Sequence, residues 1–328
     1  MIETTLRRYG PSQPLRVLVD EVNKLYHEHE AADYEATHPE IFEQLPPLWR
    51  KMLATFDSLP SVNDVASSTR GPKLRVLNLG CGTGFEAGTC LSHFGRDRIE
   101  RLVCYDPSEE MLEQSRRTLA AWGDLVEYVS ASNSLRGQFD VLVTNAVLHH
   151  MLDPVQAILD IAPLLSPGAA WLCGHEPSRR FYANSECMSV LRRHEARHGW
   201  TRFASPRKYL RRFLRSTGLI ELPADYAARR AFEQSLFKRR PPAWLISRLV
   251  DYQIVLRDSE LEGGRGLDFT ELQSAFEGVW KSIWRATYSF LGPHYEGELS
   301  AHWRSEAKRL SAKYPDDGAS CCLVWRRT

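Results

Sequence analysis

The fold of this chain is decided by the stretch Val76-Leu77-Asn78-Leu79-Gly80-Cys81-Gly82-Thr83-Gly84. Its first four residues predict a buried strand, and the rest form a glycine-rich turn that lets a ligand approach the backbone because no Cβ blocks the way. A second apolar strand, Arg101-Leu102-Val103-Cys104-Tyr105, leads to Asp106. An acid about twenty residues beyond a glycine turn is how a βαβ unit binds ribose hydroxyls. Together the two features predict a nucleoside site.

The spacing of the glycines narrows the kind of nucleoside. A dinucleotide site has the pattern G-x-G-x-x-G, with the pyrophosphate at a helix N-terminus. Here the glycines alternate at Gly80, Gly82 and Gly84 and are followed by Phe85 and Glu86. The sequence places no cluster of cations nearby to hold a pyrophosphate. We therefore expect a nucleoside without phosphates.

Three segments resemble class I S-adenosylmethionine (SAM) dependent methyltransferases. They are the stretch from Val76 to Gly84, the run Asp106-Pro107-Ser108-x-x-Met111-Leu112, and the strand Phe139-Asp140-Val141-Leu142-Val143. The resemblance implies a Rossmann-like α/β fold with a seven-stranded, mostly parallel sheet, in which strand seven enters antiparallel between strands five and six. It also implies SAM as substrate or methyl donor.

Alternating apolar and helical patterns predict four parts. They are an N-terminal helical lid (1–72), a SAM-binding core (73–176), a basic helical insertion after strand five (177–266) and the remainder of the core (267–328). Strands are expected at 75–79, 102–105, 125–129, 139–144, 169–173, 282–291 and 319–325. The principal helices are expected at 39–56 (kinked or divided at Pro46-Pro47), 86–94, 109–121, 154–165 and 298–313, with a capping box at Asp268 to Glu271.

Composition excludes several classes of protein. The 328 residues carry a net charge of +1, so the whole chain shows no bias toward nucleic acid or membrane. No signal peptide or membrane span is recognisable. None of the seven cysteines forms C-x-x-C, and no Cys/His group has zinc spacing. We therefore expect reduced core cysteines, no metal and a cytoplasmic location.

The resemblance assigns the SAM-binding residues one by one. The turn of Gly80, Cys81, Gly82 and Gly84 is expected to face the methionine part, and Asp106 the ribose. The competing interpretation of Asp106 is an N-terminal cap for the helix near Ser108.

The family usually has an acid after strand three that binds the adenine amine. Here the run is Ser130-Ala131-Ser132-Asn133-Ser134, without an acid. Ser132 and Asn133 both stay open as replacements. Asn145 at the end of strand four is expected to meet the SAM carboxylate or amine. His150, in the following Leu-His-His turn, is either a general base or a packed, hydrogen-bonded histidine.

Two reactions compete. The common activity of this fold is methyl transfer to a small molecule, which needs mainly proximity and orientation. A second resemblance, carried by Asn145 and Tyr182, is to azetidine-2-carboxylate synthases, in which the α-amine of SAM attacks its own γ-carbon and 5′-methylthioadenosine leaves. Asn145, Tyr182 and Ser205 are the candidate catalytic residues, although Tyr182 also fits a lid residue packed on the core. We place cyclisation in natural-product biosynthesis first, methyl transfer second and a non-catalytic SAM-binding protein third.

The insertion is locally basic. Between Arg179 and Arg240 there are 16 Lys or Arg and 5 Asp or Glu residues. This charge favours either a solvated helix surface or a dock for an acidic partner, such as a carrier protein with a tethered substrate, or RNA. The Arg-Arg pairs at 179–180, 192–193, 211–212 and 229–230 do not alternate regularly with aromatic residues, so base stacking is not indicated. We favour the solvated surface, and we expect no nucleic-acid or membrane partner.

Overall fold

The computed structural model describes residues 2–59, 73–203, 220–253, 266–292, 294 and 296–328. Its strands form a seven-stranded sheet in the order β3-β2-β1-β4-β5-β7-β6, in which β7 runs antiparallel to β5 and β6 and the other pairs are parallel. The strands are β1 (Leu74–Leu79), β2 (Ile99–Tyr105), β3 (Val126–Val129), β4 (Phe139–Asn145), β5 (Leu165–Pro177), β6 (Trp280–Tyr288) and β7 (Ser320–Arg327). The expected Rossmann-like fold is confirmed, including the position of strand seven.

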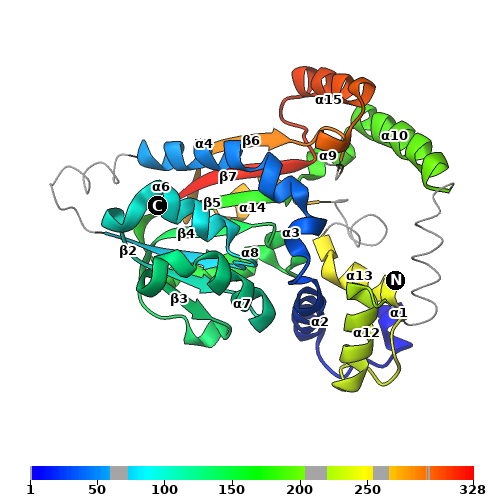
Figure 1. Ribbon diagram of the computed structural model, residues 1–328, viewed down its shortest axis with the longest axis horizontal. Coiled ribbons are helices and arrows are strands. Elements are labelled where there is room, and N and C mark those ends of the chain that lie inside the picture. The colour runs from blue at the N-terminus through cyan, green and yellow to red at the C-terminus, as the bar shows by residue number, and fades with distance from the viewer. Residues whose placement is uncertain (1, 60–72, 204–219, 254–265, 293, 295) are drawn as a thin grey trace.

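Helices cover both faces of this sheet and extend beyond one of its ends (Figure 1). The helices are α1 (Ile2–Arg7), α2 (Leu15–Glu30), α3 (Tyr34–Thr37), α4 (Pro46–Asp57), α6 (Phe85–Arg98), α7 (Glu109–Thr118), α8 (Pro154–Ile161), α9 (Arg179–Ala183), α10 (Ser185–Phe203), α12 (Pro223–Glu233), α13 (Ala243–Val250), α14 (Phe269–Ala275) and α15 (Ala301–Lys313). Shorter turns are η1 (Glu40–Gln44), η2 (Ala120–Leu125), η3 (Ser132–Ser134), η4 (Leu148–His150), η5 (Ala162–Leu164) and η7 (Glu296–Glu298).

Two apolar clusters lie on opposite faces of the sheet. Val76 and Val141 belong to the cluster beneath α4 and α6, whereas the next residues along the chain, Leu77 and Leu142, belong to the cluster against α8 and α14. Successive side chains of a strand point to opposite faces. A parallel sheet covered on both faces therefore needs almost continuously apolar strands, as this sequence has.

A third cluster joins the N-terminal segment to the insertion. Leu18 and Val22 of α2 pack with Ala227 of α12 and Leu245 of α13. These helices lie together with α1 at one end of the molecule (Figure 1). Segments about two hundred residues apart in the chain therefore share one core, which fixes α2 in place beside the sheet.

The other described helices of the insertion pack elsewhere. Val190 and Leu191 of α10 contact the group that includes Trp303 and Leu310 of α15. The described helices between 177 and 266 thus fall into two groups, one against α2 and one against α15 (Figure 1). We retain the division at 72, 176 and 266 as a proposal.

Several element boundaries differ from the sequence expectation for local reasons. The helix expected to 165 ends at Ile161, because Pro163 cannot donate to the helical ladder. The strand expected over 282–291 spans Trp280–Tyr288, and Ser289 leaves the extended conformation with φ +60°. The helix expected over 39–56 is divided at Pro46, as predicted, because proline is tolerated at the start of α4.

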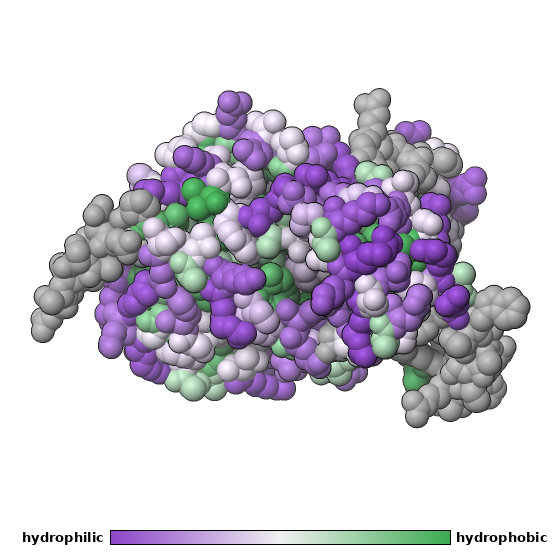
Figure 2. All heavy atoms as spheres, turned by 90° about the horizontal axis from the view of Figure 1, so that it is seen from above, coloured by the Kyte–Doolittle hydropathy of each residue, from purple (hydrophilic) through white to green (hydrophobic). Residues whose placement is uncertain are grey.

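The surface is mixed in character. On the face seen from above, hydrophilic side chains surround small, separate apolar patches (Figure 2). Among the described helices, none combines the length and the apolar character that crossing a membrane requires. All seven cysteines are free and buried, as expected for core cysteines.

Candidate nucleoside site

The glycine turn after β1 is built for close backbone approach. Gly80, Gly82 and Gly84 all have positive φ, at +68°, +48° and +91°. The amides of Gly80 and Cys81 both donate to the carbonyl of Tyr105, at 2.8 and 2.9 Å, and this ties the turn to the end of β2. A Cβ on Gly80 would stand 2.6 Å from Cγ2 of Val147. Glycine is therefore required here by both conformation and space.

Asp106 sits directly after β2 and braces the same turn. Its Oδ2 accepts from the Gly82 amide at 2.9 Å and its Oδ1 from the Ser108 amide at 3.0 Å. The N-cap of α7 is Ser108 itself, whose Oγ accepts from the Met111 amide at 3.2 Å. Burial raises the pKa of Asp106, while the two amide hydrogen bonds oppose that shift. An ionised carboxylate has about four acceptor positions, so two remain after these bonds.

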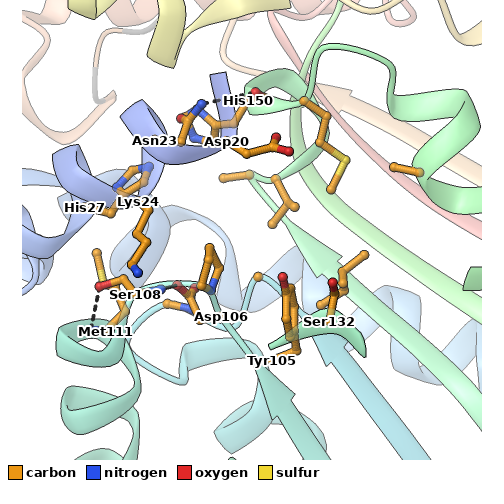
Figure 3. A pocket seen from close by; sticks show the side chains of 18 of the residues that line it. Asp20, Asn23, Lys24, His27, Tyr105, Asp106, Ser108, Met111, Ser132 and His150 are labelled. Carbon is orange, nitrogen blue, oxygen red and sulfur yellow. Dashed lines mark hydrogen bonds between the residues drawn. The ribbon is translucent and has the colours of Figure 1, made fainter. Parts of the chain in front are cut away.

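A cavity of about 390 Å³ opens beside the glycine turn, between the carboxyl ends of the strands and α2. Figure 3 shows Asp20, Asn23, Lys24 and His27 on α2, facing Tyr105, Asp106, Ser108, Met111 and Ser132. Lys24 points from the helix toward Asp106 and Ser108 (Figure 3). A cavity at this edge of a doubly wound sheet is the usual ligand position.

The structure brings together most, though not all, of the residues predicted from the sequence. Those that line this cavity are Gly80, Gly82, Asp106, Ser132, Asn145 and His150. Cys81, Gly84 and Asn133 are not among its lining residues: Cys81 is buried, and Gly84 precedes α6. Ser132 is thus better placed than Asn133 toward the cavity. Ser205 lies outside the described residues.

Asn145 occupies the end of β4 in a buried polar cluster. Its Oδ1 accepts from the indole Nε1 of Trp49 at 3.3 Å, and a side-chain hydrogen bond links it to Glu86. Burial raises the pKa of the Glu86 carboxyl to about 8. A Cβ on Gly174 would stand 2.4 Å from Asn145 Oδ1, so the neighbouring strand needs glycine there.

A second cavity, of about 230 Å³, adjoins the first. His27, Tyr34, Ala146 and His150 line both. The second cavity is rich in histidine and tyrosine, and it is Tyr182 that reaches it rather than the first. The two predicted catalytic residues that the structure describes, Asn145 and Tyr182, thus border adjoining cavities.

The turn between the cavities is held by one buried carboxylate. Glu176 Oε1 accepts from the amides of Val147 and Leu148 at 2.8 and 2.9 Å, and Oε2 lies 3.0 Å from His149 Nδ1. His150 Nδ1 donates to the Val250 carbonyl at 2.8 Å. Burial lowers the pKa of His150 well below its ordinary value, with His149 adding to the effect. His150 is therefore hydrogen-bonded and poorly suited to taking up a proton.

One group of side chains invites comparison with a metal site. His149, His150 and Asp251 each bring a donor atom within 4.8 Å of the other two. His150 Nδ1 stands 4.0 Å from Asp251 Oδ1, which is wider than the separation of about 3.4 Å between two ligand atoms of a tetrahedral zinc ion. Both histidine Nδ1 atoms are also engaged by protein acceptors. We assign no metal to this group.

The N-terminal segment supplies a hydrogen-bonded chain that sequence inspection missed. Glu30 accepts through Oε2 from His27 Nδ1 at 3.2 Å and through Oε1 from His38 Nε2 at 3.1 Å, while His38 Nδ1 lies 3.2 Å from Glu40 Oε1. Burial acts to raise the pKa of Glu30, but hydrogen bonds from both histidines outweigh it and hold the value at about 2. For His38, burial acts to lower the pKa, but the hydrogen bonds that the ring donates to Glu30 and Glu40 outweigh it and raise the value to about 9.

The described arginines of the basic insertion are extensively paired. Arg179 contacts Asp268 and Glu271 at 3.3 and 2.9 Å. Arg229 contacts Glu221 at 3.0 Å and Glu233 at 2.9 Å. Such pairs neutralise part of the local charge, which favours the solvated surface over a dock for an acidic partner. The Asp268 cap is present too, but Glu271 pairs with Arg179 instead of completing the capping box.

Comparison with known proteins adds a family match. Residues 77–170 match the model of a methyltransferase domain. The chain is 35% identical over 134 residues to the ribosomal RNA small subunit methyltransferase C of Salmonella choleraesuis (strain SC-B67), covering 39% of this chain and 37% of that protein. It is also 30% identical over 156 residues to an uncharacterized 37.1 kDa protein in transposon TN4556 of Streptomyces fradiae. That alignment covers 45% of this chain and 44% of that protein. The chain thus spans less than half of these relatives.

Among solved structures, the plantazolicin methyltransferase BamL, in complex with a triazolic desmethylPZN analog and SAH, aligns with a TM-score of 0.48 and 11% identity over 100% of this chain and 99% of that one. Residues 77–170 thus match a methyltransferase domain, and the sheet has the strand order that the sequence resemblance led us to expect. The match runs from Leu77 in β1 to the first part of β5, and it leaves the N-terminal helices and the chain beyond residue 170 outside.

Proposed function

We propose that the first cavity binds SAM. Backbone groups of Gly80 and Gly82 face the methionyl part, Asp106 accepts from the two ribose hydroxyls, Ser132 lies toward the adenine, and Asn145 lies at the amine. Support comes from the match to a methyltransferase domain and from the free acceptor positions of a buried carboxylate beside a glycine turn.

We further propose that the chain cyclises SAM to azetidine-2-carboxylate. The neutral α-amine attacks the γ-carbon, the Cγ–S bond breaks, and the sulfur keeps the electron pair as it leaves in 5′-methylthioadenosine. The amine gives up one proton in the overall reaction. The positive charge on sulfur disappears in the same step, because 5′-methylthioadenosine leaves as a neutral thioether. The site therefore needs no charged group to stabilise the leaving group.

One observation carries this proposal: the predicted amine end of the cavity is lined by groups that need not clamp an ammonium ion. Asn145 is a neutral amide. The carboxyl of Glu86 beside it has a pKa of about 8, so it remains mostly protonated at neutral pH. Tyr182 lies in the adjoining cavity, where its hydroxyl can accept from the amine once the methionyl chain folds back. Helix α2, together with Tyr34 of α3, covers part of the cavity and so reduces the access of competing water.

The second cavity favours a second candidate, SAM-dependent methyl transfer to a small molecule. A space of about 230 Å³ next to the proposed methionyl end has room for a small acceptor. If the acceptor is tethered to a carrier, the partner would be an acidic carrier protein. The third candidate is a non-catalytic protein that binds SAM without converting it. Because one relative acts on ribosomal RNA, RNA is an acceptor to include in the assay.

The test needs no acceptor to be guessed. Purified protein is incubated with SAM alone, and the mixture is analysed by mass spectrometry beside Asn145→Ala and Tyr182→Phe variants. Equal, catalytic amounts of 5′-methylthioadenosine and azetidine-2-carboxylate, reduced in both variants, would support cyclisation. Intact SAM would refute it and favour methyl transfer. Intact SAM together with tight SAM binding and no transfer to any acceptor would favour the non-catalytic protein.

A further inference from the structure

We infer that His27 is the general base that takes the proton from the reacting amine, oriented by Glu30. This inference rests on the proposed function. It applies to cyclisation and equally to methyl transfer onto an amine acceptor, because both reactions release one proton from nitrogen.

The position of His27 supports this role. It stands on the inner side of α2 and lines both cavities, at their junction (Figure 3). Its Nδ1 is engaged with Glu30 Oε2 at 3.2 Å. A carboxylate oxygen only accepts, so Nδ1 carries the proton and Nε2 is left as an acceptor. A base held in one tautomer by a carboxylate is the arrangement that proton abstraction requires.

Glu30 is held in the ionised form that this arrangement needs. Its side chain is only 9% exposed, and it receives hydrogen bonds from both His27 and His38. The pKa of His38, raised to about 9 by Glu30 and Glu40, keeps that ring charged near neutral pH. Glu30 therefore remains a carboxylate and stabilises the imidazolium that forms when His27 accepts a proton.

The neighbouring histidine is a weaker candidate. The rings of His27 and His150 are 5.1 Å apart, and both line the two cavities. His150 Nδ1 donates to a neutral backbone carbonyl at 2.8 Å and stands farther, at 4.0 Å, from Asp251 Oδ1. Burial disfavours the charged form of His150. The partner of His27 is an anion. A charge-assisted hydrogen bond is about twice as strong as a neutral one, so Glu30 holds the His27 ring more firmly in one tautomer and orientation.

In the proposed step, the substrate N–H bond breaks and an Nε2–H bond forms on His27. The proton comes from the ammonium form of the substrate, so a neutral amine is left. Its electron pair attacks the carbon of SAM while the C–S bond breaks and sulfur keeps the bonding pair. The imidazolium is paired with Glu30 until product release lets solvent take the proton. The other ionisable groups around His27 include Tyr26 on the same helix, together with Tyr34, His150, Asp106 and Asp251 from the elements packed against it.

The test compares pH–rate profiles of single turnovers of SAM. The variants are His27→Ala, Glu30→Gln and, as the matched control, His150→Gln. General-base catalysis contributes roughly 10²–10⁴-fold, so His27→Ala should lose about that factor and recover part of it with added imidazole. Glu30→Gln should lower the plateau rate and move the acid limb to lower pH, because the imidazolium loses its anion. His150 lines both cavities, so His150→Gln is expected to change the plateau rate, but it should keep the shape of the pH–rate profile.

Failure of this inference can be told apart from failure of the proposed function. If the wild type shows no turnover with SAM or with amine acceptors, the function itself falls, and the inference with it. If the wild type turns over and His27→Ala keeps its rate, or loses rate without imidazole rescue and without a change in the pH profile, only the base assignment is overturned. The dissociation constant of each variant for S-adenosylhomocysteine is measured as a control and is expected within about threefold of the wild-type value. Such binding excludes a collapsed site as the cause of a lower turnover rate.

Discussion

Replacing Asp106 with alanine tests the nucleoside site most directly. Two acceptor positions of its buried carboxylate hold the amides of Gly82 and Ser108, which leaves two for the ribose hydroxyls. A hydrogen bond to a charged group contributes about 1.5–3 kcal/mol, so loss of two predicts about 3–6 kcal/mol. The lower value corresponds to a roughly 100-fold increase in the dissociation constant for SAM.

Isothermal titration calorimetry with SAM measures this directly. The matched control is Asp153→Ala, because Asp153 lines the same cavity but its carboxylate caps α8 through the Gln156 amide at 3.0 Å. That control should lose about 1 kcal/mol of stability and little SAM affinity. Asp106→Ala also frees two amides of the turn, so circular dichroism must show both variants folded at the assay temperature. A folded Asp106→Ala protein that binds SAM within about threefold of wild type would refute the ribose assignment.

Three further predictions follow from buried polar groups. Asn145→Ala should still bind SAM but lose turnover by about 2–3 kcal/mol, the contribution of one positioned polar contact, and unchanged single-turnover rates would remove Asn145 from the mechanism. Glu86 has a folded-state pKa of about 8 against an ordinary 4.5, so the folded protein retains its proton and stability falls as pH rises through this interval. Between pH 5 and 8, the unfolding free energy of the wild type should therefore fall by on the order of 4 kcal/mol relative to that of Glu86→Gln, as measured by urea titrations. If the two proteins keep a constant difference over this range, the burial argument is contradicted. Glu176→Ala should destabilise by about 3–5 kcal/mol, because it leaves three buried amides and His149 without their acceptor, and a loss below 1 kcal/mol would show that water replaces it.

Much of the sheet could be predicted because its information is local. The glycine turn, the acid after β2 and the apolar runs of β1 and β4 are each contained in a few consecutive residues. Errors were confined to element ends, such as those near Pro163 and Ser289, where a single backbone conformation decides the boundary.

The site was predictable only in part for the same reason. Gly80, Gly82, Asp106, Ser132 and Asn145 follow strand ends, so the parallel topology alone brings them to one edge of the sheet. Tyr182, predicted as a catalytic residue together with Asn145, lines the adjoining cavity, and its catalytic role stays a proposal.

The sequence by itself determined the fold of the core and the side of the candidate nucleoside site that lies at the carboxyl ends of the strands. A βαβ unit is specified by short-range spacing, so this information is local. Only the tertiary structure decided what faces that half. His27 and Glu30 belong to α2, which is fixed in place by apolar contacts with α12 and α13. No pattern in the N-terminal segment reveals that docking, since it depends on burial shared between residues about two hundred positions apart.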